Sequence, residues 1–238
     1  MILKDCILRL SDYLKNFFAL IYPHTCCACR KALMADEVHI CLYCRLLLPK
    51  TRFHRHRDNR LTEKFWGRQP IETGTSLYYF HKGSKVQRLI HQFKYKGNTS
   101  LGFYLGAMLG RDIASSPMYE GLNYILPVPL HPKKERQRGF NQSEVIARGI
   151  ASSISVPCCN NLLIRKQETS SQTRKSRFNR WQNVSEVFDT PNPTALEGKG
   201  ILLVDDVITT GSTLEACTEK LLAIKGVKVW IATLAITD

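Results

Sequence analysis

Residues 200–213, near the C-terminal end of this 238-residue chain, constrain its fold more than any other stretch. An apolar strand at residues 201–204 runs into two adjacent carboxylates, Asp205 and Asp206, and then into a turn of Thr, Gly and Ser at residues 209–213. A strand followed by a turn and a helix is the repeating unit of α/β folds, whose ligands bind at the carboxyl ends of the strands. The sequence therefore predicts an α/β domain with a ligand site at the end of this strand.

The residues of this stretch suit a ligand that carries two neighbouring hydroxyl groups and a phosphate. The carboxylates can accept hydrogen bonds from a sugar diol, and successive backbone N–H groups of the turn can surround one anion. Gly211 lets the backbone approach that anion closely, and the helix expected at residues 214–224 adds the positive end of its dipole. Hydroxyl groups for the same anion come from Thr209, Thr210, Ser212 and Thr213. The alternative that needs no ligand is a strand that ends in two solvated Asp residues before an N-capping turn.

This stretch closely resembles the phosphoribosyl-diphosphate (PRPP) binding motif of the type I phosphoribosyltransferases. The resemblance implies that Asp205 and Asp206 hold the ribose 2- and 3-hydroxyls, and that residues 209–213 cradle the 5-phosphate. It also implies that Mg²⁺ is bound together with PRPP, because this ion prefers oxygen ligands and phosphates.

A second signal lies near the N-terminus, where four of the nine cysteines form two Cys-x-x-Cys pairs. The pairs are Cys26 with Cys29 and Cys41 with Cys44. Four thiolates complete a tetrahedral shell for Zn²⁺ and leave no position for a substrate, so we expect a structural zinc module. Cys27 is an alternative to Cys26 as a ligand, and redox-active or simply buried pairs are the alternative to a metal.

The charge of the chain indicates an anionic partner. Its 34 Lys and Arg residues against 20 Asp and Glu give a formal net charge of +14, which suits nucleic acid, an acidic membrane surface or a polyphosphate. No apolar run is long enough for a transmembrane helix, and charged residues interrupt the N-terminal apolar stretch too often for a signal peptide. We therefore expect a cytoplasmic protein with reduced thiols, with the inner face of the membrane as a second location.

Two parts are expected along the chain. Residues 1–60 would hold an amphipathic N-terminal helix, the zinc module and most of a basic, poorly structured linker at residues 51–69, and residues 61–238 the α/β domain. The helix would cover the zinc module, with membrane-surface binding as the alternative. The alternation of strands and helices predicts a parallel sheet flanked by helices. Strands are expected at residues 75–80, 123–130, 162–164, 184–188, 201–204 and 227–235, and helices at 85–95, 101–115, 142–155 and 214–224.

Two basic loops interrupt this alternation. The loop at residues 131–142 follows a strand end, and its cations could meet a pyrophosphate or a nucleic-acid backbone on the same face as the acidic pair. These cations are Lys133, Lys134, Arg136 and Arg138. The loop at residues 167–183 mixes cations with aromatic rings, which suits a lid or a single nucleic-acid strand. The residues concerned are Arg174, Arg177, Arg180 and Trp181. An ordinary solvated face is the alternative for each loop.

Several motifs in order, together with the acidic pair, are similar to the ComF/GntX family of competence-associated, phosphoribosyltransferase-like proteins. They are Pro23-x-x-Cys-x-x-Cys29, Phe93-Lys-Tyr-Lys-Gly97, Val128-Pro-Leu-His-Pro132 and Arg138-Gly-Phe-Asn-Gln142. The resemblance covers essentially the full length. It implies a type I phosphoribosyltransferase-like fold, a parallel sheet flanked by helices, behind a zinc finger. It also implies a role in natural transformation, with DNA-uptake or recombination proteins as partners.

Two functions follow as hypotheses. The first is a PRPP-binding protein that handles incoming single-stranded DNA, which the excess of positive charge favours. The second is an enzyme that transfers ribose 5-phosphate from PRPP to a nitrogen acceptor. The sequence identifies no catalytic residue for that reaction.

Overall fold

The computed structural model describes residues 24–166 and 187–237. The chain divides into two compact units, Met1–Leu48 and Pro49–Asp238. Residues 49–60, which the sequence assigned to a linker of the first part, thus belong to the second unit. Within the described residues, no helix combines the length and the apolar character needed to cross a membrane.

The described part of the first unit has a small apolar core. A bridge between Thr25 and Ala32 closes its first turn, and the short helix α2, Leu42–Leu47, ends it. Ala28 and Ile40 are almost completely buried together with the cysteines. The buried apolar side chains of residues 24–48 are few, and the cysteines form a large part of this core.

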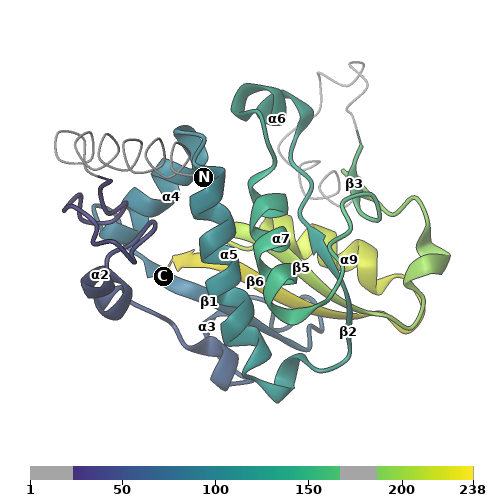
Figure 1. The fold of residues 1–238 in the computed structure, drawn as a ribbon. Helices are drawn as coiled ribbons and strands as arrows, with labels where there is room; N and C mark the ends of the chain where they lie inside the picture. The colour runs from purple at the N-terminus through teal and green to yellow at the C-terminus, as the bar shows by residue number, and fades with distance from the viewer. Residues whose placement is uncertain (1–23, 167–186, 238) are drawn as a thin grey trace, which may run out of the picture. The chain divides into compact units, whose positions relative to one another are not determined.

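The second unit is built on a four-stranded sheet in the order β1-β6-β5-β2, in which every neighbouring pair is parallel (Figure 1). The strands are β1 Thr73–Phe80, β2 Leu122–Pro127, β5 Gly200–Ile208 and β6 Lys228–Thr237. The central strands are apolar over most of their length because both faces of a parallel sheet are covered. A separate antiparallel pair joins β3, Ile164–Arg165, to β4, Phe188–Asp189. The predicted parallel α/β architecture is confirmed.

Helices cover both faces of this sheet. On one face, α5 (Thr99–Ala114) and α7 (Gln142–Ile154) lie side by side, as Figure 1 shows. On the other face, α9 (Ser212–Leu222) packs against β5 and β6. The other helices among the described residues of this unit are α4 (Lys85–Tyr95), α3 (Arg60–Glu63), α6 (Pro132–Arg138) and the 3-10 turns η1 (Phe53–Arg55), η2 (Pro117–Tyr119) and η4 (Pro193–Leu196).

Glycines allow α5 and α7 to touch. A Cβ atom on Gly106 of α5 would lie 2.4 Å from the carbonyl oxygen of Ile146, and one on Gly149 of α7 would lie 2.3 Å from that of Phe103. Both distances are far below van der Waals contact, so larger residues would force the helices apart. This close contact fixes the position of α7 on the sheet.

The basic stretch at residues 51–69 differs from the expectation of a poorly structured linker. Asn59 caps α3 through a reciprocal capping box with Thr62, and three apolar side chains of the stretch join the core. These are Phe53, Leu61 and Phe65. The apolar residues of this stretch are few and are separated by cations, so its composition resembles that of a solvated linker. Each of the three is nevertheless buried, while most of the neighbouring cations stay in water.

Candidate functional site

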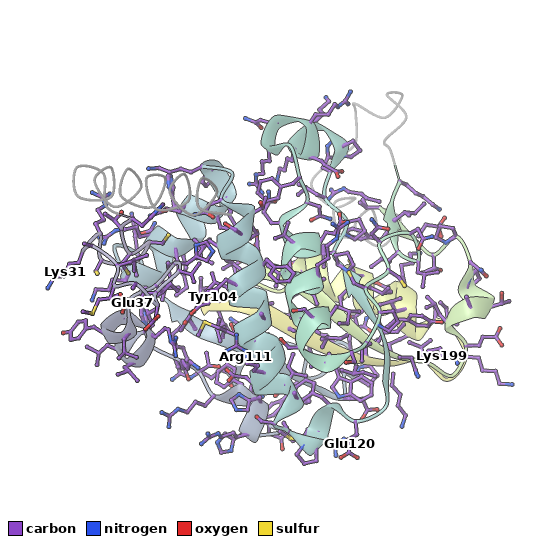
Figure 2. All side chains as sticks on the ribbon, viewed as in Figure 1. Lys31, Glu37, Tyr104, Arg111, Glu120 and Lys199 are labelled. Atoms are coloured by element: carbon purple, nitrogen blue, oxygen red, sulfur yellow. The ribbon has the colours of Figure 1, made fainter. Side chains whose placement is uncertain are left out.

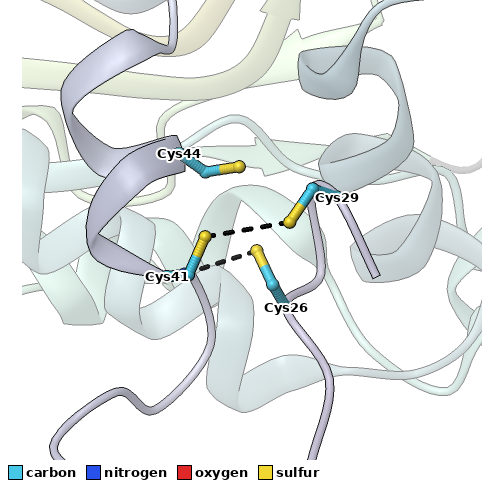
Figure 3. Close-up of side chains that lie close together, drawn as sticks. All are labelled: Cys26, Cys29, Cys41 and Cys44. Carbon is cyan, nitrogen blue, oxygen red and sulfur yellow. Dashed lines mark hydrogen bonds between the residues drawn. The ribbon is translucent and has the colours of Figure 1, made fainter. Parts of the chain in front are cut away.

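The four paired cysteines of the first unit converge on one point (Figure 3). Their Sγ atoms all lie within 4.8 Å of one another, and those of Cys29 and Cys41 are 3.7 Å apart. Tetrahedral zinc with Zn–S bonds of about 2.3 Å places its sulfurs about 3.8 Å apart, so this donor set fits the ion. Cys26, and not Cys27, contributes to the cluster together with Cys44. The predicted four-cysteine cluster is confirmed, whereas zinc in it remains a prediction.

Backbone groups favour the thiolate form of Cys26, one member of this cluster. The N–H group of Cys41 donates a hydrogen bond to Sγ of Cys26 at 3.3 Å. Burial raises the pKa of Cys26, but hydrogen bonds from the backbones of Cys41, Cys29 and Ala28 outweigh it and lower the pKa to about 7. A thiolate is the form that binds a metal, so the loop conformation prepares Cys26 for one. Burial instead raises the pKa of Cys41 and of Cys44.

The acidic pair of the second unit lies inside β5, at the sixth and seventh of its nine residues. Oδ1 of Asp205 accepts hydrogen bonds from the Ser143 hydroxyl at 2.9 Å and from the backbone N–H of Asp206 at 2.8 Å. Oδ2 of Asp206 lies 2.6 Å from Nζ of Lys94, and these two side chains are only 14% and 18% exposed. The first turn of α7 and the last turn of α4 therefore both meet the carboxylates of β5.

The environment of Asp205 opposes its ionisation. Burial and then the charge of Asp206 raise its pKa to about 7, although the N–H of Asp206, the Ser143 hydroxyl and the charge of Lys94 act in the opposite direction. At neutral pH the pair is thus close to a change in protonation. A ligand that donates hydrogen bonds or brings positive charge would favour the ionised form.

The loop after β5 leaves its polar groups accessible. Gly211 takes φ = 85° as the N-cap of α9 and, having no side chain, does not satisfy the first N–H groups of that helix. The four hydroxyl residues Thr209, Thr210, Ser212 and Thr213 are exposed. Leu214, buried in the core, anchors the start of the helix. The N–H group of Ser212 makes only a long contact, 3.5 Å, with Oγ1 of Thr210. Hydroxyls, N–H groups at the start of α9 and the helix dipole are therefore available to one anion.

The basic loop at residues 131–142 contains the short helix α6, which has no buried residue. Its cations Lys133, Lys134 and Arg136 are exposed. Arg138 differs from them, because its Nη1 donates to Oε1 of Gln142 at 2.6 Å and its guanidinium lies 5.5 Å from the centre of the Tyr95 ring. Arg138 thus connects α6 to α7 and to α4.

Lys94 and Ser143 belong to the site although no sequence argument assigned them a role. Lys94 lies inside the Phe93-Lys-Tyr-Lys-Gly97 motif, and Ser143 directly follows the Arg138–Gln142 motif. Their positions in these motifs were the available signal, but only the tertiary contacts show that both reach β5. The four residues of the second basic loop lie outside the described residues. They are Arg174, Arg177, Arg180 and Trp181.

Two surface hollows of the second unit lie away from the acidic pair. One of about 660 Å³ includes Ser115 and Leu122, and one of about 370 Å³ includes Gly200 and Lys228. Both lie at the edge where the strands begin, the edge to which Glu120 and Lys199 belong in Figure 2. They have no part in the chemistry of the acidic pair, since ligands of such sheets bind at the opposite edge.

The comparison with protein families matches the phosphoribosyl transferase domain to residues 141–237, which contain α7, β5, the acidic pair and α9. Together with the parallel sheet and its helices, this match defines a phosphoribosyltransferase-like domain.

Curated relatives extend the similarity toward the N-terminus. "Competence protein F" of Haemophilus influenzae is 30% identical over 148 residues, which are 60% of this chain and 65% of that protein. "Competence protein ComFC" of Bacillus subtilis is 29% identical over 83% of this chain and 77% of that protein. "DNA utilization protein YhgH" of Escherichia coli K12 is 26% identical over 86% of this chain and 88% of that protein. The chain thus spans slightly less than two thirds of the first relative and more of the other two.

The chain is thus similar to the ComF/YhgH proteins, with a phosphoribosyltransferase domain and an N-terminal four-cysteine cluster. These similarities confirm the family resemblance that the sequence motifs indicated.

The cysteine cluster generates a first prediction. Cys41→Ser should release stoichiometric zinc and expose residues 24–48 to proteolysis, because the loss of one of four thiolates removes most of the binding energy that folds so small a module. Metal analysis and limited proteolysis measure both effects. The matched control is Cys27→Ser, a neighbouring buried cysteine outside the cluster, which should keep its zinc. Full zinc content in Cys41→Ser would exclude the assignment.

The acidic pair generates a second prediction, on stability. The pKa of about 7 for Asp205 exceeds the unfolded value of about 3.9, so the folded state holds an extra proton between these pH values. The contribution of the protonated Asp205 carboxyl to the free energy of unfolding is fully present below about pH 4 and is lost as the pH rises through about 7. Asp205→Asn should therefore raise the melting temperature by about 3 °C or more at pH 8, and by less at pH 5.

Scanning calorimetry of the free protein at the two pH values measures this difference. Asp189→Asn is the control, because Lys166 lowers the pKa of that exposed carboxylate and its loss should not stabilise the protein at pH 8. An equal effect of Asp205→Asn at both pH values would contradict the raised pKa.

Proposed function

We propose that this chain is a PRPP-binding protein that handles incoming single-stranded DNA in the cytoplasm during natural transformation, with the inner face of the membrane as a second location. The observation that carries the proposal is the acidic pair of β5 followed by the open loop to α9, within residues matched by the phosphoribosyl transferase domain. Proteins of DNA uptake or recombination are the partners that this role requires.

For PRPP, each part of the site has a complementary group. Asp205 and Asp206 accept hydrogen bonds from the ribose hydroxyls, and the hydroxyls and N–H groups of residues 209–213 bind the 5-phosphate. Mg²⁺ bound with PRPP would supply positive charge to the pyrophosphate. The exposed cations of α6 follow β2, the strand that pairs with β5. They would neutralise the negative charge of the same pyrophosphate group.

Lys94 stabilises the Asp206 carboxylate when no ligand is bound. Its ammonium group balances the charge of Asp206 in a mostly buried position, where an unpaired carboxylate would be costly. A ribose hydroxyl that approaches Asp206 must share or replace this contact. The released ammonium group is then available to the phosphates of the ligand.

The DNA part of the proposal is supported by charge and by the relatives. The names of the relatives refer to competence and to DNA utilization. The net charge of +14 exceeds what a pocket for one small anion needs, and α6, which follows the strand β2 next to β5, exposes several cations. Phosphates of a single strand would bind these cations.

A second candidate is an active phosphoribosyltransferase with a nitrogen acceptor, which the intact acidic pair and phosphate loop favour. Catalysis would come from positioning and charge stabilisation, with Lys133 and Arg136 beside the departing pyrophosphate. Release of pyrophosphate from PRPP in the presence of candidate bases distinguishes this enzyme from a binding protein.

The site generates a prediction for PRPP. Calorimetric titration of PRPP with Mg²⁺ into the full chain should show micromolar binding, and the double variant Asp205→Asn/Asp206→Asn should lose it because neutral amides no longer accept the diol in the same way. Ser152→Ala, an exposed change on α7, is the control. A folded wild type that does not bind PRPP would refute the PRPP site.

The basic helix generates a prediction for DNA. The affinity of the full chain for an oligo(dT) strand should fall with salt with a logarithmic slope of about −0.7 per phosphate contact. Lys133→Ala/Arg136→Ala should weaken binding and reduce that slope by about 1.4. The matched control with the same charge change is Lys225→Ala/Lys228→Ala, at the strand-start edge. A flat salt response of the wild type would exclude binding through the backbone.

A further inference from the structure

The last residue of α4, Tyr95, holds an aromatic ring in water. The apolar face of this helix, formed by Val86, Leu89, Ile90 and Phe93, is buried in the second unit, whereas Tyr95 is 64% exposed. Its ring therefore contributes little to the core. Single exposed aromatic residues are common on proteins, so only the surroundings of this ring can indicate a function.

These surroundings are cationic and ordered. The Arg138 guanidinium lies 5.5 Å from the ring centre, and the His91 ring lies 5.0 Å from it at an angle of 42°. Lys94 and Lys96 flank Tyr95 in the chain. Arg138 is itself held by Gln142 at 2.6 Å, so the ring faces a guanidinium fixed from a second helix.

The Tyr95 ring also lies between the acidic pair and the basic helix α6. Its neighbour Lys94 contacts Asp206 at 2.6 Å, and Arg138 ends the basic helix α6. A second ring contact, between Phe93 and Phe140 at 5.7 Å, joins α4 to the segment after α6. The position of Tyr95 relative to the cations is thus fixed by contacts on both sides.

We propose that Tyr95 is a stacking platform for one nucleobase of a single DNA strand whose phosphates bind the cations of α6. The inference rests on the DNA part of the proposed function. An exposed ring beside a guanidinium offers a base an aromatic face and a cationic plane, while the lysines meet the flanking phosphates. Bases of a duplex stack on one another and are not available to the ring, so Tyr95 would select single strands.

The test compares two probes of equal charge and length on the full chain, an oligo(dT) strand and the same strand with abasic sites. Tyr95→Leu should weaken oligo(dT) binding about fivefold or more, because stacking on an aromatic ring is lost. Tyr95→Phe keeps the ring and should bind as the wild type does. Neither variant should alter binding of the abasic strand or the salt slope, since no phosphate contact changes.

Phe103→Leu, at a 44% exposed aromatic residue of α5, is the matched control and should leave both affinities unchanged. Equal weakening of both probes by Tyr95→Leu would mean that the ring only orders Arg138, and it would overturn the proposal. Unchanged oligo(dT) binding by Tyr95→Leu would overturn it as well. A folded wild type that binds neither probe would instead refute the DNA part of the proposed function.

Discussion

The second unit depends on how two adjacent carboxylates are accommodated in β5. Side by side and partly buried, they repel each other, and the structure offsets this with a hydroxyl from α7 and an ammonium group from α4. These contacts also set where the two helices meet the sheet edge. The arrangement that makes the acidic pair tolerable therefore brings Ser143 of α7 and Lys94 of α4 into the candidate site.

The first unit follows a different principle. Its described residues bury few apolar side chains, and its geometry is determined by four sulfur atoms near one point. The second unit folds around a parallel sheet with a continuous core on each face. The chain thus combines a unit in which four thiols lie close enough to hold one metal ion with a unit whose described residues bury an extensive apolar core.

Periodicity and spacing predicted the parallel sheet, the helices α4, α5, α7 and α9, and the convergence of four cysteines, because these are local patterns with few solutions. The stretch at residues 51–69 was wrongly expected to be poorly structured, since its buried side chains are scattered among cations. The contact of Lys94 with Asp206 joins residues 112 positions apart, and no local pattern contains it. The choice between Cys26 and Cys27 as the fourth member of the cluster likewise required the structure, because the sequence spacing is compatible with either residue.

The glycine contact between α5 and α7 has a consequence for how the site responds to change. Ser143 begins the same helix that Gly149 presses against α5, so a shift of α7 would move the hydroxyl that holds Asp205. The packing of α5 against α7 therefore fixes the position of the hydroxyl group that binds the carboxylate of Asp205. A substitution at this helix contact, although distant from the residues expected to bind phosphate, would therefore change the pKa of Asp205 before it changed the surface of the protein.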